Sequence, residues 1–202
     1  MSDRTVQDAS SRPLRADARR NREAILRAAA DRFEHDGLGV SLDAIAAHAG
    51  VGPGTLYRHF ATKHALLAAV MIDHLHDLTA RLGALAEAED ADAALRDAVR
   101  AMLAEGTRSA PLKAALAGTE LDIRSARPEA AEKLRGALAA LLSRAQSTGS
   151  VRADVDVDDL MALVAGTFKA LEYRNSPASS KRIEEILFDG LAAPHHGSVG
   201  GP

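Results

Sequence analysis

Four hydrogen-bonding side chains, Thr55, Tyr57, Arg58 and His59, lie within five residues of one another. Leu56 and Phe60 interrupt this run four residues apart, which is the spacing of one apolar face on a helix. With those two side chains facing inward, the polar groups include those left to face outward, where each can donate to a phosphate or to a base edge. The pattern predicts a short helix over residues 53–60 that presents donors to nucleic acid.

The preceding residues predict the elements that position this helix. Ser41 offers a hydroxyl N-cap to a helix over residues 42–48, and Gly50 permits a positive φ in the turn that follows. A first helix over residues 17–36 ends at Gly37, which supplies a left-handed stop. The three helices have the layout of a helix-turn-helix. Its expected core is apolar and is drawn from all three helices and the turn: Ile25, Ala28, Ala29, Phe33, Leu42, Ile45, Ala46, Val51, Leu56 and Phe60.

The rest of the chain repeats apolar residues at three- and four-residue steps, and it contains no alternating segment that would indicate a strand. We therefore expect an all-α fold. Thr62 caps a long helix that runs to about residue 86. Further helices are expected over residues 93–107, 111–123, 128–147, 156–174 and 179–192. Gly106 with Pro111, Pro128, Gly149 and the 175–177 stretch are the expected breaks.

Residues 21–70, NREAILRAAADRFEHDGLGVSLDAIAAHAGVGPGTLYRHFATKHALLAAV, resemble the DNA-binding domain of a TetR-family transcriptional regulator. The resemblance joins Ile-Leu-x-Ala-Ala in the first helix, Phe33 before Gly37, Ile45-Ala46 with Ala49-Gly50-Val51, Gly54-Thr55-Leu56-Tyr57-x-His59-Phe60, and Lys63 with Leu66-Leu67. It covers about a quarter of the chain. The later helices are similar to the family in number and length.

The resemblance implies which residues meet DNA. Thr55, Tyr57, His59 and Lys63 would hold phosphates, as would Ser41 at the start of its helix. Arg58 and the turn formed by Gly52, Pro53 and Gly54 would approach bases. Because this turn exposes almost no side chain, Arg58 and the shape of the duplex would carry more of the specificity.

Charge adds Arg19 to the predicted interface. The whole chain has a net charge of −3, but residues 12–32 hold seven arginines against three acids. This local surplus can attract phosphate, although a solvated tail followed by an ordinary charged helix face would give the same composition. Residues 1–63 sum to about +2 and the remainder to −5.

The resemblance also implies a helical body that dimerises and responds to a small molecule. The last two helices each carry an apolar stripe. They would pair with the same helices of a second copy in a two-fold interface, although both stripes also fit the subunit's own core. The interface residues would be Leu163, Thr167, Leu171, Ile183, Ile186, Leu187 and Leu191. A ligand cavity would lie among the middle helices, where each residue equally fits plain core packing. The candidate residues are Met71, Leu75, Leu103, Leu116, Thr119, Glu120 and Phe168.

Other motifs are set aside. Gly50-x-Gly52-x-Gly54 follows no strand and lacks the spacing of a phosphate-binding loop. His74 and His76 point about 200° apart on a helix, so they cannot share a metal. The run of aspartates at 154, 156 and 158 lacks the glycine and glutamate of a calcium loop and instead favours a helix N-cap. The His195-His196 pair belongs to a tail without expected function.

Enzymatic readings find little support. Without cysteine, the chain can have no disulfide, thiolate nucleophile or cysteine-ligated metal. It also has no Gly-x-Ser-x-Gly elbow and no His-Glu-x-x-His pair. We therefore expect no catalytic residue, no metal and no cofactor.

The predicted protein is a cytoplasmic homodimer without a membrane segment, because no apolar run reaches about 18 residues. It has a disordered basic arm over residues 1–14, a DNA-binding domain over 15–63, an effector-binding and dimerisation domain over 64–193 and a disordered tail over 194–202. The expected function is ligand-released repression at a palindromic operator in double-stranded DNA. An activator or a constitutive DNA binder on the same fold, and a helical enzyme or scaffold, are the alternatives.

Overall fold

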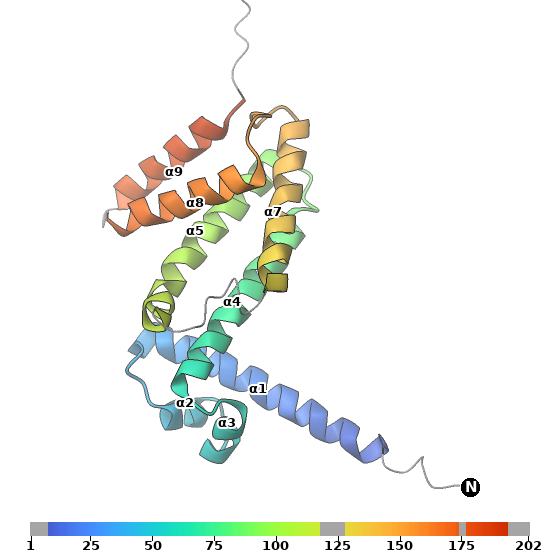
Figure 1. Cartoon of the computed structure of the whole chain (residues 1–202), viewed down its shortest axis with the longest axis vertical. Coiled ribbons are helices and arrows are strands. Elements are labelled where there is room, and N and C mark those ends of the chain that lie inside the picture. The colour runs from blue at the N-terminus through green and yellow to red at the C-terminus, as the bar shows by residue number, and fades with distance from the viewer. Residues whose placement is uncertain (1–7, 118–127, 174–176, 194–202) are drawn as a thin grey trace, which may run out of the picture. The chain divides into compact units, whose positions relative to one another are not determined.

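The structure, a computed structural model, describes residues 8–117, 128–173 and 177–193, with side chains described over 16–117, 128–173 and 180–193. In these ranges it is all-helical (Figure 1), apart from an isolated bridge between Val151 and Ala192, which confirms the predicted fold class. The helices are α1 (Asp8–Asp36), α2 (Leu42–His48), α3 (Pro53–His59), α4 (Lys63–Leu85), α5 (Ala91–Leu116), α7 (Pro128–Ser147), α8 (Val157–Glu172) and α9 (Pro177–Leu191).

The chain forms two compact units. The first unit comprises the described residues up to Asp73 together with residues 111–117, and the second comprises residues 74–110 with the described residues from 128 onward. The chain changes unit within α4 after Asp73 and again within α5 at Pro111. Both helices therefore run through both units, and the first unit is discontinuous in sequence. The predicted domain boundary at residue 63 lies before the first of these changes.

The first unit contains the predicted helix-turn-helix. Ile25, Ile45 and Leu56, one from each of its first three helices, are completely buried. Gly37 and Gly50 have φ values of 74° and 69°, so the left-handed conformations expected after α1 and α2 are confirmed. Burial of side chains from α4 and from the end of α5 completes the apolar interior of this unit: Leu66, Leu67, Ala68, Val70, Met71, Leu112 and Leu116.

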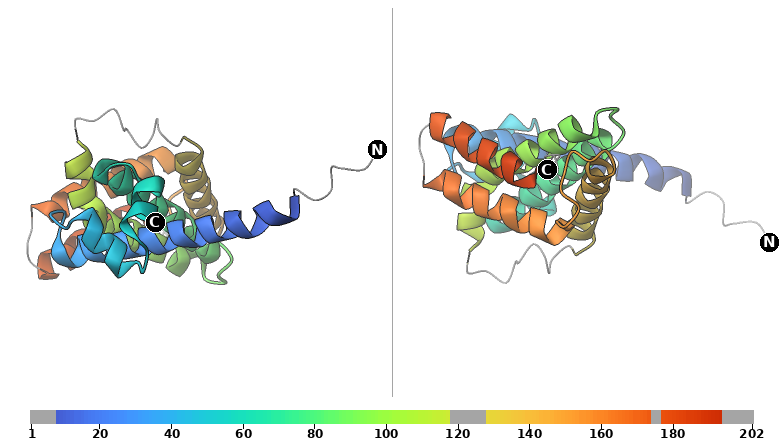
Figure 2. Two further views of the ribbon diagram at one scale, coloured as in Figure 1. Left: turned by 90° about the horizontal axis from the view of Figure 1, so that it is seen from below. Right: turned by 90° about the horizontal axis from the view of Figure 1, so that it is seen from above.

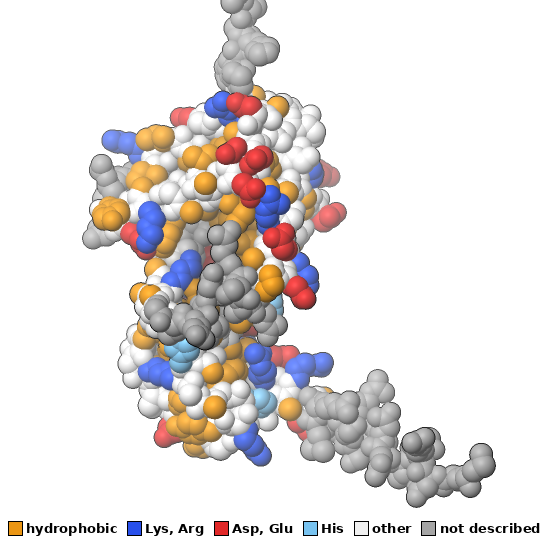
Figure 3. All heavy atoms as spheres, viewed as in Figure 1, with side chains coloured by type: hydrophobic (Ala, Val, Ile, Leu, Met, Phe, Trp, Pro, Cys, Tyr) orange, Lys and Arg blue, Asp and Glu red, His pale blue; other side chains and the backbone are white. Residues whose placement is uncertain are grey.

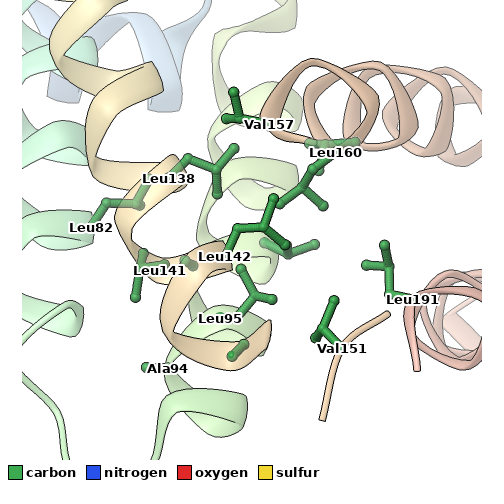
Figure 4. Close-up of a cluster of buried hydrophobic side chains, with 14 of the residues drawn as sticks. Leu82, Ala94, Leu95, Leu138, Leu141, Leu142, Val151, Val157, Leu160 and Leu191 are labelled. Carbon is green, nitrogen blue, oxygen red and sulfur yellow. The ribbon is translucent and has the colours of Figure 1, made fainter. Parts of the chain in front are cut away.

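The second unit has a core built by all of its helices (Figure 4). Leu82 of α4, Leu95 of α5, Leu138 of α7, Leu160 of α8 and Leu191 of α9 are members of one buried cluster. Figure 2 shows α8 and α9 side by side at one surface of this unit. Asp156 caps α8, since its carboxylate accepts from the backbone N–H groups of residues 158 and 159, as the sequence predicted.

Two predicted boundaries are wrong. The backbone of α1 is helical from Asp8, well before the expected start at residue 17 and inside the stretch predicted to be a disordered arm. The helices expected over 93–107 and 111–123 are one helix, α5, up to Leu116, with Pro111 inside it; the later part of the second prediction lies outside the described residues.

The reason that α5 continues lies in how its two predicted breakers are used. A Cβ on Gly106 would come within 2.8 Å of the Phe168 ring, so this glycine allows close packing of α5 against α8. Pro111 removes only the hydrogen bond to the carbonyl of Thr107, and both residues are exposed.

No helix in the described part of the chain is both long enough and apolar enough to cross a bilayer.

Candidate nucleic-acid interface

The turn between α2 and α3 is fixed by capping and backbone hydrogen bonds. Ser41 Oγ accepts from the Ala44 N–H at 3.1 Å and so starts α2. At the other end, the N–H groups of Gly50 and Val51 donate to the carbonyls of Ala47 and Ala46. Pro53 then occupies the first turn of α3, where its missing N–H costs nothing. The short α3 is therefore held at both sides by local geometry.

The outer surface of α3 carries the predicted donors. Tyr57 is 48% exposed and Arg58 is exposed, whereas Thr55 and His59 are half-buried. Arg58 Nη2 donates to Thr55 Oγ1 at 3.1 Å, one turn earlier on the same helix. This bond steadies a long side chain while leaving its other donors available to a partner. The His59 ring is tilted at 45° to the Phe60 ring, with 6.3 Å between centroids.

Neither the backbone conformation nor close packing among the described residues requires glycine at position 52 or 54. Neither has a positive φ, and a Cβ added at either position would meet no atom within 4 Å. The fold would accept a side chain there. What a glycine offers at such positions is the close approach of another molecule to the backbone.

Lys63 on α4 and Arg19 on α1 are the predicted DNA contacts that lie on the other helices of this unit. Lys63 is half-buried, and its Nζ donates to the Val40 carbonyl at 2.6 Å, which ties the start of α4 to the loop before α2. Its ammonium has two further protons for a phosphate. Arg19 on α1 is exposed, and its Nε lies 3.7 Å from Glu23 Oε1. Every predicted DNA-binding residue thus lies in the first unit, and its contact with DNA stays a prediction.

The second unit contains a buried polar cluster that sequence reasoning missed. His74 and Ser109 are only 7% and 3% exposed. His74 Nδ1 lies 3.1 Å from Glu105 Oε1 and 3.3 Å from Ser109 Oγ, while Ser109 and Arg108 also donate to the Glu105 carboxylate. Spacing on α5 could have shown the pairing of Glu105 with Arg108 and Ser109, but nothing in the sequence indicates His74 as the fourth member.

The cluster changes the protonation of Glu105. Burial works to raise the pKa of this carboxyl, but the hydrogen bonds from His74, Ser109 and Arg108 outweigh burial and lower the pKa to about 2. Glu105 is therefore a carboxylate at neutral pH, fully engaged by three donors. The arrangement ties α4 to α5 within the second unit.

The residues predicted to line a ligand cavity are not gathered into one described site. Met71 and Leu116 are buried in the first unit, whereas Leu75, Leu103 and Phe168 belong to the second and pack in or against its core. Thr119 and Glu120 lie outside the described residues. Their joint role as an effector pocket stays a prediction.

The predicted interface residues divide between two environments. Leu163 and Ile186 are 44% and 64% exposed, whereas Leu187 and Leu191 are buried in their own subunit's core. Thr167, Leu171 and Ile183 are half-buried. Six of these seven residues line an open, mostly apolar groove of about 800 Å³ along α8 and α9, and Leu171 does not. Elsewhere on this unit, Figure 3 shows acidic side chains gathered on the visible face.

Comparisons with known proteins cover most of the chain. Residues 25–70 match the family described as bacterial regulatory proteins, tetR family, and residues 90–193 match the SbtR-like transcriptional regulator C-terminal domain. No curated protein matches the chain.

Solved structures extend these matches. A TetR transcription regulatory protein from Mycobacterium vanbaalenii is 40% identical over 90% of this chain and all of its own, with a TM-score of 0.73. The TetR regulator SCO0520 from Streptomyces coelicolor is 30% identical over 86% of this chain and 99% of its own, with a TM-score of 0.68. A regulator from Saccharomonospora viridis, solved in complex with choline, shares the fold at 22% identity and a TM-score of 0.63, over 83% of this chain and 93% of its own. The chain belongs to the TetR family of transcriptional regulators.

Proposed function

We propose that this regulator represses transcription by binding a palindromic operator as a homodimer, and that a small molecule releases it. The single observation that carries the DNA-binding part is the surface of α3. Its exposed Tyr57 and Arg58 lie beside two glycines whose backbones face open space. A helix with donors on one side and an unobstructed backbone at its start fits a major groove closely.

The two-fold arrangement is supported by the groove along α8 and α9. Its exposed members, Leu163 and Ile186, are large apolar side chains, and they adjoin residues already packed in the core. A second copy of the same face would cover them, as in helix-bundle interfaces. The dimer would then present two α3 helices to two half-sites.

Ligand release requires that the effector prefer the conformation that does not bind DNA. A tenfold loss of operator affinity needs a coupling free energy of about 1.4 kcal/mol. α4 and α5 are the described helices that run through both units, so a ligand that shifts either helix can act on the DNA-binding unit. Each is continuous across the change of unit, which favours transmission through a stiff element over a flexible linker.

Selection of bound duplexes from a random pool tests the DNA-binding proposal directly. We expect a palindromic site whose half-sites are separated by about one helical turn, or a multiple of it. Binding to this site should weaken as salt rises, because phosphate contacts release counterions. Recovery of no enriched sequence, together with salt-insensitive binding, would contradict the proposal.

Sedimentation velocity tests the homodimer. Ile186→Glu places a charge on the exposed part of the groove and should yield folded monomers, with helix content by circular dichroism unchanged. Leu187→Glu serves as the contrasting variant, because its side chain belongs to the subunit's own core and a charge there should unfold the second unit. If Ile186→Glu still sediments as a dimer, the dimer interface does not include the exposed part of this groove.

Release is tested by screening small molecules for those that raise the melting temperature, and then measuring operator affinity with each. Stabilising compounds should weaken operator binding. If a broad set of stabilising compounds leaves operator affinity unchanged, the protein is a constitutive DNA binder.

A further inference from the structure

A crevice of about 240 Å³ lies between α4 and α5 within the second unit. Its lining residues fall between positions 77 and 81 on α4 and between positions 101 and 108 on α5. None of them belongs to the predicted ligand cavity, and none lines the groove along α8 and α9. The crevice is therefore a separate feature of this unit, and charged side chains from both helices line it.

The α4 wall carries one charge of each sign. Asp77 and Arg81 are both exposed, and neither forms an ion pair or a hydrogen bond with the side chains that the structure describes. Residues four apart on a helix share a face, with about 5–6 Å between their Cβ atoms. A carboxylate and a guanidinium thus face the same space, where they can bind the two charges of a small dipolar molecule.

The α5 wall adds a guanidinium that is already oriented. Arg108 is exposed, and its Nε and Nη2 donate to Glu105 Oε2. A guanidinium has five N–H donors, so three remain for a ligand. Glu105 itself is engaged by His74 and Ser109 as well as by Arg108. Its charge is therefore satisfied within the protein, and the Arg108 donors that it leaves unused are held in place.

The rest of the lining is apolar and small. Leu78 is half-buried, Ala101 is buried and Ala104 is exposed. The volume of the crevice lies below the roughly 300–1,000 Å³ of pockets that hold drug-sized ligands, so it suits a molecule of few atoms. A fitting ligand has two opposite charges close together and a short aliphatic group beside them.

We propose that this crevice binds an aliphatic α-amino acid, and that this amino acid is the small molecule that releases the protein from its operator. Arg81 and Arg108 hold the ligand carboxylate, because a guanidinium matches a carboxylate in charge and geometry. Asp77 accepts from the ammonium group, and the aliphatic side chain lies against Leu78. The second part of the proposal rests on the proposed function, because it assumes that the protein binds an operator.

The crevice adjoins the polar cluster that ties α4 to α5. A ligand carboxylate competes with Glu105 for Arg108, and Glu105 is the residue that holds His74 and Ser109. α4 enters the second unit at His74, and α5 leaves this unit after Ala110. The ligand therefore acts on these two helices close to the points where both continue into the first unit. Its preference for one arrangement of the cluster would shift the conformational equilibrium.

Calorimetric titration of the intact protein at pH 7 tests the site with L-alanine, L-valine and L-leucine as probes. Two analogues of leucine carry one charge each: 4-methylpentanoate lacks the ammonium group, and 3-methylbutylamine lacks the carboxylate. We expect at least one of the amino acids to bind once per chain. Each analogue should bind about tenfold or more weakly than leucine, because it loses hydrogen bonds to a charged group.

Two variants locate the site. Arg81→Gln and Asp77→Asn should each weaken amino-acid binding by about tenfold or more, because each removes one of the two charges. Lys133→Gln is the matched control, since Lys133 is an exposed cation on α7, which does not line the crevice. All three side chains are exposed, so helix content by circular dichroism should match that of the wild type.

The site is overturned if the wild type binds none of the three amino acids, or if Arg81→Gln and Asp77→Asn both bind them as the wild type does. Operator affinity is then measured with and without a saturating amount of the amino acid that binds. We expect a loss of about tenfold in the wild type and no loss in Arg81→Gln.

Three failures can be told apart in this design. Operator affinity that does not respond to a bound amino acid would overturn its role in release and leave the binding site in place. Absence of amino-acid binding would overturn the site while operator binding persists. A wild-type protein that binds no operator would instead refute the proposed function.

Discussion

The two units of this regulator use polar side chains in opposite ways. In the first unit, Tyr57 and Arg58 face solvent from a short helix. In the second unit, His74, Glu105 and Ser109 are turned inward and satisfy one another. An exposed donor set is completed by a partner from outside, whereas a buried set is already complete and fixes the packing of its helices. Substitutions should therefore affect binding in the first unit and stability in the second.

The largest effect is expected from Glu105→Ala. The change leaves His74 and Ser109 buried without their acceptor, which should lower the free energy of unfolding by about 1 to 3 kcal/mol. Urea denaturation of the purified protein measures it. Glu132→Ala, an exposed glutamate on α7, is the control and should stay within about 0.5 kcal/mol of wild type. Equal effects of both variants would show that the cluster has no special role.

A loss of operator affinity of similar size is expected from Arg58→Ala, without a change in stability. Removing a base contact should weaken specific binding by about 1 to 3 kcal/mol and relax the preference at one base pair. Affinities for the selected operator and for single-base variants of it provide the measurement. If the operator and a random duplex lose equally, Arg58 contacts a phosphate and not a base.

The stability that Glu105 contributes should depend on pH. Its folded pKa of about 2 lies below the ordinary value of 4.5, so the unfolded chain takes up this proton first as pH falls. The contribution is thus fully present above about pH 4.5 and is lost as pH falls toward about 2. The difference in unfolding free energy between wild type and Glu105→Gln should narrow across that range. A difference that stays constant would contradict the lowered pKa.

A smaller effect is expected from Lys63→Ala, because one charge is removed from the rim of the interface. Affinity for operator and random duplex should fall similarly, and the salt slope should flatten by about one unit. Lys63→Arg should keep the slope. Since the Lys63 ammonium also donates to the Val40 carbonyl, the melting temperature of Lys63→Ala must be compared with that of the wild type. An unchanged slope would remove Lys63 from the DNA contacts.

The smallest effect on the free protein is expected from Gly54→Ala. Its added Cβ meets open space and alanine favours a helix, so the melting temperature should stay the same or rise slightly. Operator affinity should nevertheless fall, because the methyl group keeps the backbone away from the duplex. Titration of the operator with both proteins measures this. Unaltered affinity would mean that DNA does not approach this turn closely.

The sequence predicted the first unit well because local rules decide its structure. Gly37 and Gly50 adopt the positive φ values expected of them, and Ser41 caps α2 as its hydroxyl suggested. The DNA-binding residues could be proposed for the same reason, since Leu56 and Phe60 fix which side of α3 is outward.

The second unit was harder to predict because its decisive contacts join distant residues. Gly106 looked like a helix breaker, but its role is set by Phe168 on another helix. The apolar stripe on α9 could be recognised in the sequence. The spacing of its residues could not show, however, that Leu187 is buried while Ile186 next to it is exposed. The three- and four-residue spacing of apolar residues identifies only the apolar side of a helix. Which part of that side the same subunit covers depends on the neighbouring helices.

The sequence discontinuity of the first unit has a consequence for biosynthesis. Leu112 and Leu116, which are buried in this unit, come at the end of α5. A ribosome that has made residues 1–73 must therefore continue through most of α5 before the DNA-binding unit can close, a delay of a few seconds at about 5–20 residues per second. A nascent or truncated chain that ends before α5 lacks these two leucines, so we expect the first unit to be complete only once the segment that also builds the second unit has been synthesised.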